Sequence, residues 1–263
     1  MNLYLHGIGG TESPTTTDDS LRGATKDRYD IVLTNPPFGN RSSITIATDG
    51  SKQNNTASTY EREDFWATTS NKQFNFLQHI KTILKTDGRG AVVLPDNVLF
   101  ERGAGETIRR QLLKQFDVHT LLRLPTGIFY AQGVKANVLF FDKRPAREEP
   151  WTRKLWIYDL RTNKRFTLKT NPLSDSDLQD FINVYNPENR EARVETERFR
   201  VFNYDQLIER EHVNLDIFWL KEDSLEDAAD LPTPDVLVAE ITENLEAALA
   251  QFQSIQAELD NNE

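Results

Sequence analysis

The chain has 263 residues, of which 38% are apolar and 27% are charged, and this composition predicts a folded protein rather than a disordered one. It contains no cysteine and only four widely separated histidines, which excludes disulfides, thiolate metal sites and cysteine nucleophiles, argues against a zinc enzyme, and fits a reducing cytoplasm. No apolar run approaches the roughly 18 to 20 residues that a helix needs to cross a bilayer, and the first residues lack the basic flank and long apolar stretch of a signal peptide, so we expect no membrane partner.

The net charge of −10 is unevenly distributed along the chain. Residues 205–263 hold 16 acidic and 2 basic side chains, whereas residues 1–204 hold 25 acidic and 29 basic ones. The first part therefore has a net charge of +4 and is free to meet phosphates. The acidic tail is either a solvated helix face or an acid-rich docking surface.

The first predicted strand, residues 29–34, is an apolar run that we expect to be buried and that stops at Asn35-Pro36-Pro37. Proline has no N–H for a sheet and pushes the preceding residue out of the helical region, so the strand must end in a stiff loop. Residues 40–60 are polar and weakly periodic, which is typical of a functional lid or a disordered segment. A helix is predicted over residues 71–84, followed by a turn at 87–90 and a buried parallel strand at 91–94.

The following segments continue the alternation of strands and helices. A helix is predicted near 106–116, a strand near 120–124, a glycine-bearing loop at 125–135 and a strand at 136–141. This order predicts an open α/β sheet that finishes in a β-hairpin. Beyond Pro150 the pattern changes, with a strand predicted at 154–160, a helix at 175–185 and a short helix at 204–210. We expect three parts, namely residues 1–145, a mixed α+β extension at 146–231, and a long C-terminal helix at 232–263.

The predicted C-terminal helix follows Pro232 and Pro234, with Asp235 as its N-terminal cap. Apolar residues then repeat at alternating spacings of 3 and 4, which forms a seam of three heptads; they are Val238, Ile241, Leu245, Ala248, Phe252, Ile255 and Leu259. Such a seam packs either on its own domain or on a partner helix. Its place at the chain end, after a proline-rich joint and among acidic residues, favours a partner helix and a coiled coil.

Asn35-Pro36-Pro37-Phe38 carries the clearest chemistry in the chain, because ligands of open α/β sheets bind at the carboxyl ends of strands. An exocyclic amine on an aromatic ring is a poor nucleophile, since its lone pair is delocalised into the ring. The side-chain oxygen of Asn35 and the backbone oxygen of Pro36 can accept hydrogen bonds from both N–H groups of such an amine, in a direction that the prolines fix. Phe38 then offers a face on which a flipped-out base stacks.

Residues 34–39, Thr-Asn-Pro-Pro-Phe-Gly, resemble the catalytic motif of DNA methyltransferases that act on the N6 amino group of adenine. Three further stretches look like the modification subunit of type I restriction–modification systems: residues 76–80 (FLQHI), 88–95 (GRGAVVLP), and 124–129 with 133–141 (LPTGIF and GVKANVLFF). As a set they are similar to that family from Met1 to about Lys143, and more weakly through the tail. A partial Rossmann-like methyltransferase sheet is the fold that this resemblance implies.

The resemblance also implies a function and its residues. The enzyme uses S-adenosylmethionine to methylate adenine N6 in DNA, with a specificity subunit and a restriction subunit as further partners. It implies that the target adenine is held by Asn35, Pro36, Pro37 and Phe38. Three further assignments follow from the resemblance. Phe76 matches the aromatic position that borders the adenine of S-adenosylmethionine. Phe129 would help to hold the flipped base, and Lys135 would contact DNA phosphate. The alternatives are an ordinary turn at residues 35–38 and, for Phe129, a hairpin aromatic that closes the core.

One departure from the family pattern concerns the cofactor. The family places an acidic or aromatic residue and a glycine-rich turn after its first strand, upstream of everything matched here. Gly7-Ile8-Gly9-Gly10 follows no predicted strand and Gly88-Arg89-Gly90 precedes one, so neither cradles a nucleotide. We therefore expect a truncated or split gene product that lacks the first strands and the helical domain before them, is inactive alone, and is weakly stable or self-associating because an apolar strand edge is uncovered.

Two other functions stay open. The chain is either part of the methyltransferase or a non-catalytic assembly module, whose terminal heptads dock on the specificity subunit while the rest contacts DNA. Glutamine methyltransferases of proteins use a related Asn-Pro-Pro loop, but the stretch at 133–141 argues against that third interpretation.

Overall fold

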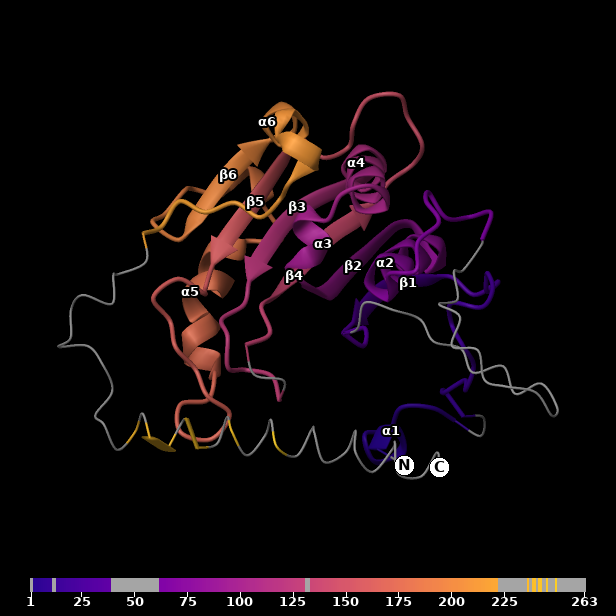
Figure 1. Cartoon of the computed structure of the whole chain (residues 1–263). Helices are drawn as coiled ribbons and strands as arrows, with labels where there is room; N and C mark the ends of the chain where they lie inside the picture. The colour runs from indigo at the N-terminus through magenta and orange to yellow at the C-terminus, as the bar shows by residue number, and fades with distance from the viewer. Residues whose placement is uncertain are drawn as a thin grey trace.

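The computed structural model describes residues 2–10, 13–38, 62–130 and 133–221, together with seven single positions between 236 and 249. Its centre is a six-stranded mixed sheet with the strand order β1-β2-β4-β3-β5-β6 (Figure 1). The strands are β1 (Tyr29–Thr34), β2 (Leu84–Pro95), β3 (Phe116–Arg123), β4 (Ala136–Lys143), β5 (Lys154–Asp159) and β6 (Phe199–Asn203). β1 is parallel to β2 and β3 to β5, while β4 and β6 run antiparallel to their neighbours. The carboxyl ends of β1, β2, β3 and β5 therefore share one edge of the sheet.

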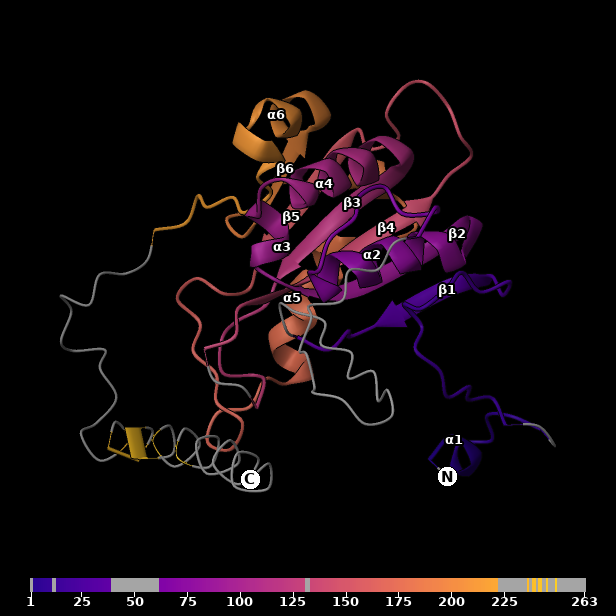
Figure 2. The same cartoon turned by 45° about the vertical axis from the view of Figure 1, so that its right-hand side comes forward.

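Helices cover both faces of the sheet (Figures 1 and 2). On one face lie α2 (Lys72–Ile83), α3 (Asn97–Phe100) and α4 (Ala104–Gln115), and α5 (Asp175–Tyr185) packs against the other. α6 (Tyr204–Glu209) and the 3-10 turns η1 (Arg190–Ala192) and η2 (Glu211–Val213) complete the part after β5. The short α1 (Asn2–Leu5) lies away from the sheet in both views.

Strand alternation divides the core into two apolar clusters, because successive side chains of a strand point to opposite faces. On β4, Leu139 and Phe141 belong to the cluster beneath α2 and α4, whereas Ala136 and Phe140 belong to the cluster beneath α5. The other central strands divide in the same way. The fold is thus the mixed α/β architecture that the sequence predicts, and β3 and β4 form an antiparallel pair, which lies in the middle of the sheet and not at its end.

Three features differ from the predictions. The turn expected at residues 87–90 is wrong, because this segment belongs to β2; a positive φ of 64° at Asp87 and a register shift opposite β1 let the strand continue through these residues. β6 was not predicted. Both β5 and β6 join the same sheet as β1 to β4, so the core runs across the expected division at 145/146.

β1 is not a buried strand as expected but an edge strand of the sheet. Val32 packs against the cluster beneath α2, while Tyr29, Ile31 and Leu33 on the opposite side of β1 are 49%, 53% and 77% exposed. Among the described residues no strand pairs with the outer edge of β1. An apolar strand with an uncovered face and an open edge favours association with further chain.

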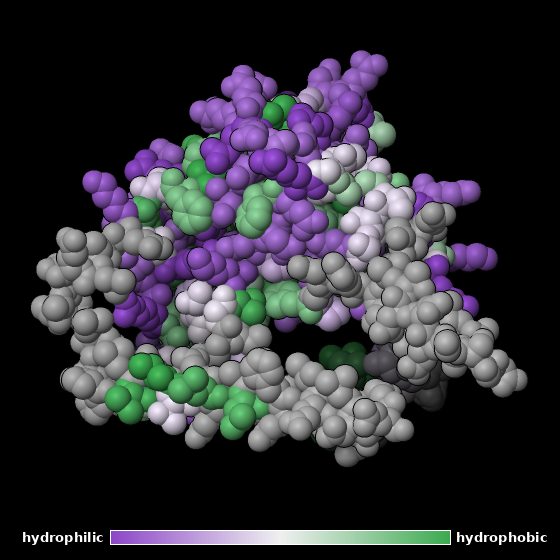
Figure 3. All heavy atoms as spheres, viewed as in Figure 1, coloured by the Kyte–Doolittle hydropathy of each residue, from purple (hydrophilic) through white to green (hydrophobic). Residues whose placement is uncertain are grey.

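The expected lid at residues 40–60 and most of the C-terminal seam lie outside the described residues. Of the seam, Val238, Ile241 and Leu245 are helical and more than half exposed, and Thr242 donates a hydrogen bond to the Val238 carbonyl at 2.8 Å. The described residues of this segment show a line of apolar atoms in the space-filling view (Figure 3). In the part of the chain that the structure describes, no helix is long and apolar enough to span a membrane.

Candidate functional site

The loop of residues 35–38 begins where β1 ends, at the edge shared by the carboxyl ends of the parallel strands. Pro36 is buried, Phe38 is partly buried, and Asn35 and Pro37 are exposed. The Asn35 side chain makes no hydrogen bond within the described residues, which leaves its amide oxygen available. The two prolines limit the backbone rotation that would redirect this group.

The structure brings together two of the predicted site residues from distant parts of the chain. The rings of Phe38 and Phe129 lie 5.7 Å apart between centroids at an interplanar angle of 72°, an edge-to-face contact. Val93 and Val134 belong to the same apolar cluster. The aromatic pair thus joins the end of β1 to the loop between β3 and β4.

The loop of residues 124–135, which carries Phe129, closes on the sheet at its base, where the Leu124 N–H donates to the Ala136 carbonyl at 2.9 Å. Gly127 has a φ of +82°, and a Cβ at this position would lie 1.8 Å from the Phe166 carbonyl oxygen. Only glycine fits this close approach. Tyr130, the next residue after Phe129, is 92% exposed, so the two rings point to different environments.

Phe76 and Lys135 are not drawn into the aromatic pair. Phe76 is partly exposed on α2 and belongs to neither apolar cluster, and among the described residues no ring contact joins it to Phe38. Lys135 is exposed at the end of the 124–135 loop, and its backbone carbonyl accepts a hydrogen bond from the Asp96 N–H at 3.1 Å.

An ionic cluster at the same edge was not predicted from the sequence. The Arg161 guanidinium donates to both carboxylate oxygens of Asp96 at 2.7 and 2.9 Å, and the Asn137 amide donates to Asp96 at 2.8 Å. Burial acts to raise the pKa of Asp96, but the hydrogen bonds and charge of Arg161 outweigh it, so the pKa lies below its ordinary value. An acidic residue directly after an apolar strand is the sequence signal that could have indicated Asp96.

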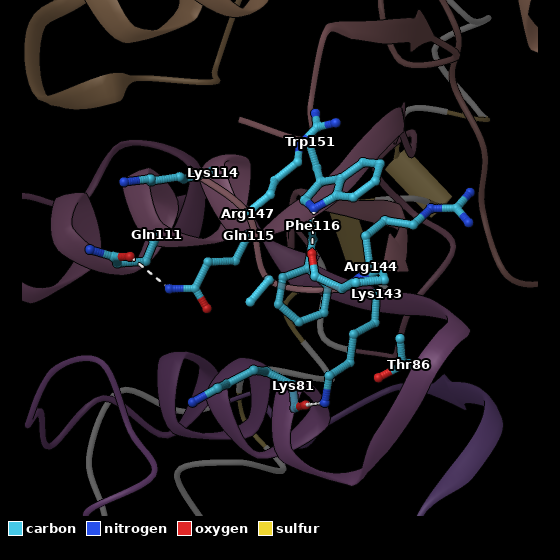
Figure 4. Close-up of a pocket in the computed structure, with 12 residues that line it drawn as sticks. Lys81, Thr86, Gln111, Lys114, Gln115, Phe116, Lys143, Arg144, Arg147 and Trp151 are labelled. Carbon is cyan, nitrogen blue, oxygen red and sulfur yellow. Dashed lines mark hydrogen bonds between the residues drawn. The ribbon is translucent and has the colours of Figure 1, made fainter. Parts of the chain in front are cut away.

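A cavity of about 490 Å³ lies at the opposite edge of the sheet, between α2, α4 and the segment after β4 (Figure 4). Its cationic lining residues are Lys81, Lys114, Lys143, Arg144 and Arg147. The Lys143 amine donates to the carbonyls of Lys81 and Leu84 at 2.8 and 2.7 Å, and burial lowers the pKa of Lys143. Lys143 therefore serves the fold, and none of the predicted site residues lines this cavity.

Comparison with known proteins relates the chain to one family. The family model described as N-6 DNA Methylase matches residues 1–221. The chain is 39% identical, over 98% of its length, to the methylase subunit of the type I restriction enzyme EcoKI from Escherichia coli, and 38% identical over the same share to that of StySJI from Salmonella typhimurium. It covers 53% of each of these relatives, so the chain spans about half of their length.

Solved structures show the same relationship. The crystal structure of the EcoKI M protein superimposes with a TM-score of 0.69 and 36% sequence identity, covering 98% of this chain and 56% of that one. The family model covers most of the chain, and the chain therefore belongs to the N-6 DNA methylase family, in which it is similar to methylase subunits of type I restriction enzymes.

Proposed function

We propose that this chain is the adenine-presenting part of an S-adenosylmethionine-dependent enzyme that methylates adenine N6 in DNA within a type I restriction–modification complex. The observation that carries the proposal is the loop of residues 35–38 at the carboxyl edge, with Phe38 in edge-to-face contact with Phe129. The relatives that support it are named as methylase subunits of type I restriction enzymes.

The residues of the loop explain how an adenine amine is presented. A base inside a duplex is out of reach, so it must leave the stack and enter the site, where the rings of Phe38 and Phe129 bound it. Asn35 Oδ1 and the Pro36 carbonyl oxygen accept the two N–H groups of the amine. These acceptors hold the amine so that its nitrogen lone pair is directed out of the ring plane, with no acid or base needed in that step.

We further propose that most of the site for the methyl donor lies outside the described residues of this chain. The cofactor supplies an electrophilic methyl group when bound, and its nucleotide moiety needs a glycine-rich turn between a strand and a helix. The described strands lead instead into a proline loop after β1, into Asp96 after β2 and into the 124–135 loop after β3. Phe76 is the one position proposed to border the cofactor. The exposed edge and apolar side of β1 are the surface on which the remainder of the enzyme packs.

DNA, a specificity subunit and a restriction subunit are the partners that we propose. Lys135, exposed at the end of the loop that carries Phe129, is placed to meet a phosphate next to the flipped base.

The test is reconstitution. The chain is combined with the remaining portion of a related methylase subunit and its specificity subunit, and DNA exposed to S-adenosylmethionine is digested and analysed by mass spectrometry. We expect N6-methyladenine from the assembled enzyme and none from the chain alone. Methylation of cytosine instead, or of protein glutamine, contradicts the proposal.

A second candidate function, a non-catalytic assembly module, is favoured by one observation: Val238, Ile241 and Leu245 are helical and exposed on one side. Leu245→Asp is expected to abolish co-purification with the specificity subunit, and Thr242→Asp, next to the seam, to leave it intact. Equal retention of both variants contradicts docking through this helix.

A further inference from the structure

The loop of residues 124–135 has to hold Phe129 in one place relative to Phe38. Gly127 and Gly133 both adopt positive φ values, and glycine loses more conformational entropy than other residues when it is held in one conformation. Ile128 and Val134 pack against the apolar cluster beneath α5 and restrain part of the loop. Hydrogen bonds at the two ends of the loop would restrain it further.

The Arg161 side chain binds both ends of this loop. Its Nε donates to the Leu124 carbonyl at 2.9 Å, directly after β3, and its Nη2 donates to the Ala136 carbonyl at 2.9 Å, where β4 begins. Arginine presents its donors in a rigid planar fork, so the two carbonyls are held in one geometry. Lysine, with a single nitrogen, is unable to span the same two acceptors and a carboxylate.

Asp96 anchors this fork to the end of β2. Its two carboxylate oxygens accept hydrogen bonds from Nη1 and Nη2 of Arg161, which forms a bidentate pair. The side chain of Arg161 is 10% exposed and that of Asp96 is 16% exposed. Its backbone N–H donates to the Lys135 carbonyl at 3.1 Å, so Asp96 also binds the last residue of the loop directly. Charge-assisted bidentate pairs are among the stronger hydrogen bonds in proteins and fix orientation as well as distance.

The turn after β5 presents Arg161 to the loop. Asp159 accepts hydrogen bonds from the N–H groups of Arg161 at 2.8 Å and Thr162 at 2.7 Å. Arg198 stabilises the same turn from outside, donating to the Asp159 and Thr162 carbonyls at 3.0 and 2.9 Å, without contacting the loop. Arg161 thus departs from a braced turn and reaches back across the sheet edge.

From this geometry we propose that Arg161 and Asp96 are positioning residues, which clamp the 124–135 loop at both ends and thereby fix Phe129 against Phe38 to receive the flipped base. The proposal rests on the proposed function and deepens it. It connects the end of β5, which lies far from the adenine loop in the sequence, to the geometry of base binding.

The test compares Arg161→Lys and the near-isosteric Asp96→Asn with the matched control Arg200→Lys, because Arg200 is an exposed arginine of β6 that pairs with Glu195 at 3.5 Å. Hydrogen–deuterium exchange of the isolated chain is measured by mass spectrometry for peptides covering residues 124–135 and, as a reference, α4. We expect exchange in the loop to rise about 10- to 100-fold in the first two variants, since charged hydrogen bonds are lost. Exchange in α4 and throughout Arg200→Lys is expected to stay at the wild-type rate.

The second readout uses the reconstituted enzyme with two duplexes. One carries 2-aminopurine at the target position, whose fluorescence rises when the base leaves the stack, and the other carries adenine there and is used to measure kcat. For Arg161→Lys we expect a smaller fluorescence rise and a kcat lowered about tenfold or more, with the KM for S-adenosylmethionine unchanged. A merely structural role would instead lower the amount of folded enzyme and leave the kcat per folded molecule unchanged.

The outcomes separate the two proposals. Unchanged loop exchange in both Arg161→Lys and Asp96→Asn overturns the clamp, whatever the activity. Raised exchange with wild-type fluorescence and kcat overturns the link to base binding. If the wild-type assembly itself forms no N6-methyladenine, the proposed function fails, and the exchange data still decide whether the clamp exists.

Discussion

Asn35 is exposed at the end of β1 with its side-chain amide unused by the fold, whereas the adjacent Pro36 is buried. Because the exposed Asn35 amide has no hydrogen-bond partner among the described residues, we expect it to contribute little to the free energy of unfolding. Its proposed role is therefore in binding the base. Phe38 and Phe129 are similar in this respect, because their contact links two loops and adds little to the central core.

Asn35→Ala is therefore expected to lower kcat of the reconstituted enzyme by about 10²- to 10³-fold, the usual effect of deleting one preorganised hydrogen-bonding group at a reacting centre. Its unfolding midpoint in urea is expected to match that of the wild type. Asn183→Ala, an exposed amide on α5, is the control and should leave both quantities unchanged. An Asn35→Ala enzyme with wild-type kcat rules out the proposed role of this side chain.

Asp142, on the opposite sheet edge, provides a prediction about pH. Burial opposes its ionisation, but hydrogen bonds from His119 and Arg190 outweigh burial and lower its pKa to about 2. Arg190 and Arg144 approach its carboxylate to 2.8 and 3.1 Å. Because the folded pKa lies below the ordinary value of 3.8, ionised Asp142 stabilises the fold fully above about pH 4, and this contribution is lost as the pH falls towards 2.

Asp142→Asn should accordingly destabilise the chain most at neutral pH. Urea unfolding midpoints of wild type and variant are compared at pH 7, 4.5, 3.5 and 2.5. The difference between the two urea midpoints should be constant down to about pH 4 and become smaller below that pH. A gap that is independent of pH over this whole range shows that the ionised form of Asp142 gives no net stabilisation.

At the scale of the elements, periodicity predicted the long helices well and the sheet edges poorly. α5 was predicted with its observed bounds, and α2 and α4 to within two residues, because apolar residues repeat at helical spacing on one side of each of them. The glycines at 88 and 90 suggested a turn, yet Arg89 and Gly90 pair with both β1 and β4 and belong to β2, while Asp87 with its positive φ lies in the irregular stretch before them. β6 was missed because five residues with alternating exposure give too short a pattern.

The candidate site was predictable to a similar extent. The loop of residues 35–38 stands out because prolines follow an apolar strand, and the role of Phe129 came from resemblance to a family. The pairing of Asp96 with Arg161 joins residues 65 positions apart. It depends on β2, β4, β3 and β5 lying in that order, which no local pattern reveals.

The exposed edge strand β1 leads to a prediction about self-association. In the isolated chain Leu33→Lys is expected to reduce self-association, because Leu33 is the most exposed apolar residue of this strand. Its unfolding free energy should change by less than about 0.5 kcal/mol, as for other surface substitutions. Sedimentation velocity and urea unfolding measure the two effects. Val32→Lys, which disrupts the packing of β1 on the cluster beneath α2, should instead destabilise the chain. A wild-type chain that stays monomeric at high concentration refutes the association through β1.

For the whole molecule, the described structure is a methyltransferase-type sheet whose two edge strands, β1 and β6, differ in how their side chains are covered. On β6, Phe199 is buried, and Val201 and Phe202 pack against the two apolar clusters. On β1, Tyr29, Ile31 and Leu33 are exposed in the described residues. This asymmetry supports the proposal that the open side of β1 packs against further polypeptide, which holds the methyl donor.

The most direct test of that claim is isothermal titration of S-adenosylmethionine into the purified chain, with and without a hemimethylated duplex, and then into the reconstituted enzyme. We predict no measurable heat of binding for the chain alone in either case and saturable binding for the assembly. Micromolar binding by the isolated chain contradicts the proposal that the methyl donor is held by other polypeptide, because such binding requires a cofactor site within this chain.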